Sequence, residues 1–124
     1  MKKVLIVEDS ELVRQQVHRM LVMAGYQAID AANGAEGLDR LKLEPDIGLV
    51  LCDVHMPRMG GLDLLGECRA LGLTTPIVVL TSEVLPGAMR LARELGAKAW
   101  VIKPVKPDVL LSVVTKLLGP ATVV

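Results

Sequence analysis

Five short apolar runs, each followed by a stretch with helical spacing, determine what this chain can fold into. After each run, apolar residues recur every three or four positions, which is the period of one face of an α-helix. Parallel strands need long crossovers that are usually helical, so this alternation predicts an α/β fold with helices on both faces of a parallel sheet. The expected strands are Val4–Val7, Ala28–Ala31, Ile47–Cys52, Ile77–Leu80 and Ala99–Ile102.

Start and stop residues frame the five expected helices. Asn33 precedes Glu36 by three residues, which is a variant of the capping box at the start of the second helix. Pro86 and Pro107 stand in the first turns of the fourth and fifth helices, where the missing N–H group has no helical partner in any case. A glycine in the left-handed conformation commonly follows the last turn of a helix. The glycines expected at helix ends are Gly25, Gly72, Gly96 and Gly119.

The alternation occupies nearly the whole chain and predicts one domain. A length of 124 residues is close to one domain's worth. A content of 52% hydrophobic and 23% charged residues supplies a core and excludes a disordered chain. The runs Ile47–Cys52 and Ile77–Leu80 lack polar alternation, as expected of central strands buried on both faces. We expect a domain over residues 1–120 and a short tail or linker stub over residues 121–124.

Composition excludes several classes of function. The 14 Lys and Arg residues balance the 14 Asp and Glu residues, so no global field attracts DNA or an anionic membrane. Aromatic residues make up only 2%, too few for a stacking platform, and no apolar run approaches the roughly 18 residues of a membrane span. Cys52 and Cys68 are too few for a disulfide framework or a four-ligand zinc site. We therefore expect a cytoplasmic protein with buried thiols and without direct nucleic-acid or membrane partners.

Polar side chains stand directly after four of the five expected strands. In open parallel sheets, ligands bind beyond the carboxyl ends of the strands, near the point where the strand order reverses. Three carboxylates, a hydroxyl and an ammonium group are therefore expected to converge on one edge of the sheet. These groups belong to Glu8, Asp9, Asp53, Thr81 and Lys103.

The three carboxylates predict a metal site. Brought within a few ångströms, they would repel one another, and at least one would hold a proton. A hard divalent cation removes this conflict, and Mg²⁺ characteristically accepts one or two carboxylates, water and a phosphate oxygen. The ammonium group of Lys103 and the hydroxyl of Thr81 could then neutralise and bind a phosphoryl group on Asp53.

These motifs resemble those of a known family. The chain resembles the receiver domain of bacterial two-component response regulators from Lys3 to about Leu118, most closely the stand-alone, CheY-like chemotaxis form. The resemblance implies a flavodoxin-like (βα)5 fold, a doubly wound parallel five-stranded sheet of order 2-1-3-4-5. The motifs that carry it are Val7-Glu8-Asp9-Ser10, Asp53-Val54-His55-Met56-Pro57, Thr81-Ser82 and Lys103-Pro104.

The resemblance also implies a role for each residue of the site. Asp53 would accept a phosphoryl group from the phosphohistidine of a sensor histidine kinase or phosphotransfer domain. Such a domain is a phosphoacceptor, not an enzyme with a separate substrate: it catalyses its own phosphotransfer and slow autodephosphorylation. Thr81 and Lys103 would bind the phosphoryl oxygens. Magnesium, Mg²⁺, with manganese, Mn²⁺, as a substitute, would be held by Glu8, Asp9, Asp53 and the backbone carbonyl of His55.

Phosphorylation would change a surface of the domain. The new charge on Asp53 would draw Thr81 toward the site. Trp100, three residues before Lys103, would then move into the vacated space. The surface of the fourth helix, fifth strand and fifth helix would then control the binding of a downstream protein target. Apolar residues there suit a phosphorylation-dependent dimer equally well. The Lys103–Pro104 peptide bond is expected to be cis.

Three positions depart from the family pattern. Glu8 stands where Asp is commoner, so its longer side chain would reach the metal through water. Gly60-Gly61 replaces the more frequent Asp-Gly and predicts a looser loop after Asp53. Val105 stands where a Phe is frequent. None of the three removes a required group.

The sequence positions of two histidines and one glutamate also suggest roles for these residues. His55 and Glu83, two residues after Asp53 and Thr81, are expected to set the rate at which water hydrolyses the phosphorylated aspartate; the alternative is that both are ordinary exposed loop residues. His18 is expected at the surface of the first helix.

Other functions compete with the switch. A small phosphatase or phosphotransferase with an aspartate nucleophile would place the same groups around a phosphoryl group, but such enzymes usually need a cap and a second acidic residue where this chain has His55. A constitutive scaffold has no use for an acidic cluster. A flavodoxin-type cofactor binder needs a glycine-rich phosphate loop, which does not follow the first expected strand.

Overall fold

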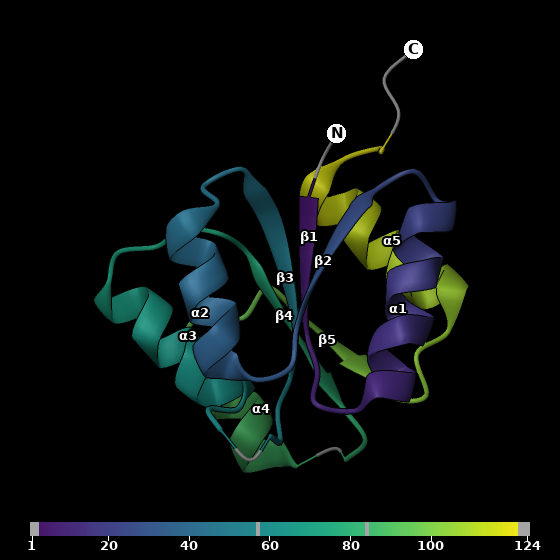
Figure 1. Cartoon of the computed structure of the whole chain (residues 1–124). Helices are drawn as coiled ribbons and strands as arrows, with labels where there is room; N and C mark the ends of the chain where they lie inside the picture. Colours follow the sequence, from purple (N-terminus) through teal and green to yellow (C-terminus); the bar gives the residue numbers. More distant parts are fainter. Residues whose placement is uncertain (1–2, 57, 84, 122–124) are drawn as a thin grey trace.

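The computed structural model describes residues 3–56, 58–83 and 85–121 and confirms the predicted α/β fold (Figure 1). The sheet is parallel and five-stranded, with the flavodoxin-like order β2-β1-β3-β4-β5. The strands are β1 (Lys3–Val7), β2 (Gln27–Ala31), β3 (Ile47–Asp53), β4 (Ile77–Thr81) and β5 (Ala99–Ile102). The helices are α1 (Glu11–Met23), α2 (Gly34–Leu43), α3 (Gly61–Ala70), α4 (Pro86–Glu94) and α5 (Pro107–Leu118).

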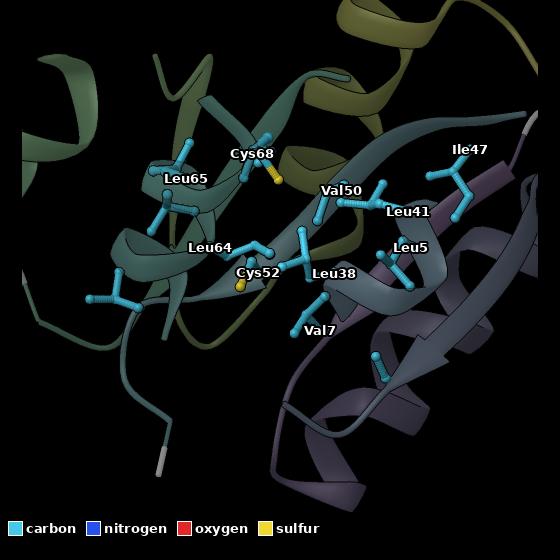
Figure 2. Close-up of a cluster of buried hydrophobic side chains, with 14 of the residues drawn as sticks. Leu5, Val7, Leu38, Leu41, Ile47, Val50, Cys52, Leu64, Leu65 and Cys68 are labelled. Carbon is cyan, nitrogen blue, oxygen red and sulfur yellow. The ribbon is translucent and has the colours of Figure 1, made fainter. Parts of the chain in front are cut away.

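Helices cover both faces of the sheet and create two separate cores. Helices α1 and α5 lie on one face, and α2, α3 and α4 lie on the other (Figure 1). Alternate residues of a strand point to opposite faces, so the continuous apolar run of β3 supplies both layers. Leu49 and Leu51 join the core under α1 and α5, whereas Val50 and Cys52 join the core under α2 and α3 (Figure 2).

Strand ends and helix starts follow the predicted residues closely. Two strands run one residue further than expected, and these extra residues belong to the predicted site: β3 ends at Asp53 and β4 ends at Thr81. Asn33 caps α2, because its Oδ1 atom accepts the Glu36 N–H group at 2.9 Å. Prolines begin α4 and α5, as predicted. The glycines at the predicted helix ends, Gly25, Gly72, Gly96 and Gly119, all have positive φ.

Four smaller expectations concern the cysteines, membrane-spanning helices, His18 and the C-terminal tail. Cys52 and Cys68 are free and buried, as expected. Among the described residues, no helix combines the length and the apolar character that crossing a bilayer requires. His18 is not simply solvated, because its Nδ1 atom lies 2.8 Å from Asp30 Oδ1 and ties α1 to β2. Of the predicted tail, residues 122–124 lie outside the described residues, and the domain boundary at residue 120 stays a prediction.

Candidate functional site

The fold brings the predicted site residues to one edge of the sheet. Glu8 follows β1, and Asp53 ends β3 beside it, because Val7 and Cys52 are register partners in these neighbouring strands. Thr81 ends β4, and Lys103 follows β5. The strand order reverses between β1 and β3, where ligands bind in open α/β sheets. The structure therefore gathers the groups that the sequence places after separate strands.

Three carboxylates form the centre of the site. One oxygen atom from each of Glu8, Asp9 and Asp53 lies within 4.8 Å of the others. Glu8 is fully buried and Asp53 nearly so, whereas Asp9 is exposed. The acidic cluster therefore has a closed inner side and an outer side that water can reach.

Lys103 supplies the opposing charge. Its Nζ atom lies 2.9 Å from Asp53 Oδ2 and also donates a hydrogen bond to Glu8 Oε1. The ammonium group thus bridges two of the three carboxylates, although it follows a strand two positions away from β3 in the sheet. The Lys103–Pro104 peptide bond is cis, as expected.

Burial and charge shift the protonation equilibria of this pair. Burial raises the pKa of Glu8 to about 7 from its ordinary 4.5, nearby Asp53 adds to the rise, and the hydrogen bond from Lys103 opposes it. Burial works against the charge of Lys103, but its hydrogen bonds to Glu8 and Asp53 outweigh that effect and raise its pKa. Glu8 can therefore hold a proton near neutral pH when no cation is bound.

Backbone and side-chain hydrogen bonds position the carboxylates. The Ser10 N–H group donates to Glu8 Oε2 at 3.4 Å, and the Ser10 hydroxyl caps α1 by accepting the Val13 N–H group at 3.3 Å. Arg14 Nη1 donates to the backbone carbonyl of Glu8 at 2.7 Å. Sequence reasoning missed Arg14; its place one turn into a helix that starts at the site was the available signal.

Thr81 is engaged in a local turn. Its hydroxyl donates to the carbonyl of Glu83 at 2.8 Å and accepts the N–H group of the same residue at 3.1 Å. Only 1% of Thr81 is exposed. The hydroxyl must therefore release the Glu83 carbonyl before it can donate to another acceptor.

His55 and Glu83 are both exposed beside the site. The N–H group of His55 donates to Asp53 Oδ1 at 3.3 Å, which places the start of this loop against the carboxylate. His55 also lines an open hollow of about 460 Å³, together with Val54, Met56, Gly60 and Asp63. This hollow lies beside the loop that follows Asp53.

The loop after Asp53 is tighter than predicted. The expectation of a looser loop at Gly60-Gly61 was wrong, because both glycines are buried against the end of β3. A Cβ atom on Gly60 would lie 2.2 Å from the Val54 carbonyl oxygen, and one on Gly61 would lie 2.9 Å from that of Asp53. The absence of side chains lets the loop fold back closely. Pro57, which is part of the same motif, lies outside the described residues.

Trp100 is half-buried on β5 and packs against the core under α2 and α3. Its indole Nε1 atom is buried and has no hydrogen-bond partner among the described residues. The side chain also borders two hollows, one beside α4 and one beside the segment from Lys103 to Val109. Trp100 therefore occupies a position with space on both sides and an unsatisfied polar group.

The donor set fits a hard divalent cation. Carboxylate oxygens are the preferred ligands of such ions, and a cation would relieve the repulsion among Glu8, Asp9 and Asp53. The exposed side of Asp9 leaves room for water ligands. The buried acidic group is thus compatible with a divalent metal site.

Comparisons with known proteins agree with this geometry. Residues 4–115 match the response regulator receiver domain family. The chain is 32% identical to the chemotaxis protein CheY of Thermotoga maritima, over 94% of this chain and 97% of that protein. It is 36% identical to the sensory/regulatory protein RpfC of Xanthomonas campestris over 93% of its own length, but spans only 16% of that protein.

Solved structures show the same likeness in three dimensions. The chemotaxis protein CheY4 of Vibrio cholerae superposes with a TM-score of 0.89 at 35% identity, covering 95% of this chain and 99% of that one. Receiver domains of two-component systems interact with histidine kinases and with downstream targets. The match over almost the entire chain, together with the arrangement of the acidic edge, leads to one conclusion: the chain belongs to the family of response regulator receiver domains.

Proposed function

We propose that this receiver domain is a phosphorylation-activated switch, in which Asp53 accepts a phosphoryl group from the phosphohistidine of a sensor histidine kinase or phosphotransfer domain. The observation that carries the proposal is the convergence of the Glu8, Asp9 and Asp53 oxygens opposite the ammonium group of Lys103. Such an arrangement neutralises charge around a transferring phosphoryl group, which is most of what catalysis of this transfer requires.

The transfer itself needs little covalent chemistry from the protein. An Asp53 oxygen forms a bond to phosphorus while the bond from phosphorus to the donor imidazole nitrogen breaks, and the nitrogen keeps the electron pair. Lys103, already 2.9 Å from Asp53, binds one phosphoryl oxygen. Mg²⁺, or Mn²⁺ in its place, would be held by Glu8, Asp9, Asp53 and the His55 backbone carbonyl, and supplies neutralisation of the phosphoryl charge.

The same groups account for the loss of the phosphoryl group. Water forms a bond to phosphorus while the bond from phosphorus to the Asp53 oxygen breaks, which releases inorganic phosphate and regenerates the Asp53 carboxylate. This slow autodephosphorylation returns the domain to its unphosphorylated state. His55 and Glu83 are exposed two residues after Asp53 and Thr81 and would set how fast water reaches the phosphoryl group.

Phosphorylation would reach the surface through Thr81 and Trp100. When the Thr81 hydroxyl leaves Glu83 for a phosphoryl oxygen, the space that it vacates becomes available to the indole of Trp100. A buried N–H group without a partner costs about 1–3 kcal/mol, so the present position of Trp100 is not strongly favoured. The rotation changes the surface formed by α4, β5 and α5.

This surface is suited to a protein partner. It exposes large apolar side chains from all three elements, namely Leu91, Ile102 and Val109. Surfaces of this kind mark protein interaction sites, so we assign the face to a downstream target or to a second phosphorylated copy of the domain. The buried, free thiols suit a reducing compartment, and we place the exchange in the cytoplasm.

A phosphatase with an aspartate nucleophile is the main alternative. The second acidic residue that such an enzyme would use is replaced by His55. Its side chain is exposed, and the described contact between His55 and the Asp53 carboxylate is made by the backbone N–H group. A phosphoacceptor that keeps its phosphoryl group until water arrives fits the site better.

Asp53→Asn is expected to abolish phosphorylation. An amide oxygen is a poor nucleophile, so the variant should retain no label when it is incubated with labelled acyl phosphate or phosphorylated kinase and Mg²⁺. Asp63→Asn is the matched control, because Asp63 is an exposed carboxylate that lines the neighbouring hollow. Label retained by the Asp53 variant would place the acceptor elsewhere.

The affinity for Mg²⁺ is expected to depend on pH through Glu8. Because the Glu8 pKa is about 7 without metal, a proton competes with Mg²⁺ below that pH, and the dissociation constant should be about tenfold higher at pH 6 than at pH 8. Calorimetric titration at each pH measures this ratio. Glu8→Gln should bind more weakly and lose the pH dependence; a wild-type affinity that is constant over this range contradicts the prediction.

The stability of the metal-free protein should show the opposite pH trend. The folded state holds the Glu8 proton more tightly than the unfolded chain, so the contribution of Glu8 is present below pH 4.5 and is lost as the pH rises to about 7. Urea unfolding in a chelator across this range, compared with Glu8→Gln, isolates the effect. As the pH rises across this range, the unfolding free energy of the wild type should fall relative to that of Glu8→Gln.

Replacing both His55 and Glu83 by Ala is expected to change the lifetime of the phosphorylated state several-fold, since both flank the approach of water. The measurement is the decay of label after the phosphodonor is removed. An unchanged half-life, with unchanged initial labelling, would identify the two side chains as ordinary exposed loop residues.

Trp100 is the only tryptophan, so its fluorescence reports the proposed movement directly. Addition of Mg²⁺ with an acyl-phosphate mimic such as beryllofluoride should reduce quenching by acrylamide as the indole turns inward. Asp53→Asn in the same buffer provides the baseline. Emission and quenching that do not respond in the wild type would show that Trp100 is a fixed residue of the sheet edge.

A further inference from the structure

We propose that Gly34, in the first turn of α2, is a positioning residue for the metal site. The inference rests on the proposed function, because it concerns the loop whose His55 carbonyl would hold Mg²⁺. Gly34 itself touches neither the carboxylates nor Lys103 in any described contact. Its role is to hold the segment between Asp53 and α3 in the position that presents the His55 carbonyl to the metal.

A forked hydrogen bond joins α2 to this segment. The N–H group of Gly34 donates to the carbonyl of Met59 at 3.0 Å and to that of Arg58 at 3.1 Å. Both acceptors lie between His55 and the start of α3. A single amide of α2 therefore fixes the outer side of the loop.

The approach is too close for any side chain at position 34. A Cβ atom on Gly34 would lie 2.1 Å from the Met59 carbonyl oxygen and 2.8 Å from Met59 Cγ. The first of these neighbours is backbone, so it cannot move aside as the end of a flexible side chain can. A substitution at Gly34 must displace the loop, the helix, or both.

Contacts from neighbouring segments hold this loop in a backbone conformation that is unfavourable for a residue other than glycine. Met59 has a φ of 58°, in the left-handed region, and no other described non-glycine residue has a positive φ. Such a conformation persists where surrounding contacts determine it, often at functional sites. On its inner side the same loop is closed by the Gly61 N–H group, which donates to the Val54 carbonyl at 3.2 Å. Gly34 provides the outer contact.

The turn before α2 also contacts the other metal-binding loop. The carbonyl of Ala31, three residues before Gly34, accepts the N–H group of Glu8 at 3.1 Å. Between these two contacts, Asn33 Oδ1 accepts the Glu36 N–H group at 2.9 Å and Glu36 Oε2 accepts the Ala32 N–H group at 3.3 Å, which stiffens the turn. One short rigid segment thus spans from Glu8 to the loop that follows Asp53 and sets the distance between them.

The test compares Gly34→Ala with Gly37→Ala. Gly37 is a buried glycine on the same helix, and a Cβ atom there would press on Val7 Cγ2 at 2.8 Å without meeting the loop. Both variants should lower the unfolding temperature, but only Gly34→Ala should weaken Mg²⁺ binding, by about tenfold or more in calorimetric titration, as is typical when a group that orients a ligand is lost. Equal losses of Mg²⁺ affinity in the two variants would overturn the proposal.

A second substitution tests the cause of the loss. In Gly34→Ala, the additional change Met59→Gly removes the Cγ contact and lets the loop backbone relax, so part of the Mg²⁺ affinity should return. Gly66→Ala is the neutral control, because a Cβ atom there meets nothing within 4 Å. A double variant that binds no better than Gly34→Ala would count against positioning through Met59.

Hydrogen exchange tests the contact without any substitution. If the Gly34 bond and the metal site are coupled, saturating Mg²⁺ should slow exchange of the Gly34 amide several-fold, while the Ala97 amide, bonded to Ala92 far from the site, is unaffected. Unchanged exchange at Gly34 would overturn the proposal. A wild type that binds no Mg²⁺ would instead refute the proposed function, so the two failures are distinguishable.

Discussion

Repulsion among carboxylates at the carboxyl edge of the sheet is the constraint to which the rest of the structure responds. Glu8 and Asp53 are buried side by side, and burial alone would make two negative charges there very costly. Lys103 makes the pair tolerable by bridging both groups. Burial, together with the nearby Asp53, still raises the pKa of Glu8 to about 7, so the metal-free site can exchange a proton for a divalent cation. At Glu8, the protonated form favours the stability of the metal-free fold, whereas cation binding requires the ionised form.

The two apolar clusters confine this electrostatic repulsion to the edge of the sheet. Because β3 contributes alternate side chains to two independent apolar clusters, the sheet remains anchored while the loops beyond its edge adjust. The groups expected to move, Thr81 and Trp100, sit on β4 and β5, at the side of the sheet covered by α4. Helix α4 contributes a single buried residue, Ala92, to the core, which is consistent with an element that responds to changes beneath it.

Periodicity and strand-end chemistry predicted most of this molecule. The apolar runs located all five strands, most clearly the central strands β3 and β4, where burial on both faces leaves no polar alternation. The parallel topology then implied that Glu8, Asp9, Asp53, Thr81 and Lys103 share an edge. The strand order and the residue roles came from family resemblance. What escaped prediction depends on individual backbone and side-chain contacts, which leave no periodic pattern in the sequence. Examples are the forked bond from Gly34, the fold-back at Gly60, and the pairing of His18 with Asp30.

Cys52 lies next to Asp53, the proposed phosphoacceptor, yet it is fully inaccessible. Its thiol is buried, burial raises its pKa far above the ordinary value, and its only described polar contact is a hydrogen bond to the carbonyl of Asp53. A thiol in this state does not form the thiolate that peroxides and electrophiles attack. The immediate neighbour of Asp53 is therefore protected from oxidation, and the phosphate signal proposed for this domain would be insulated from thiol chemistry at that position.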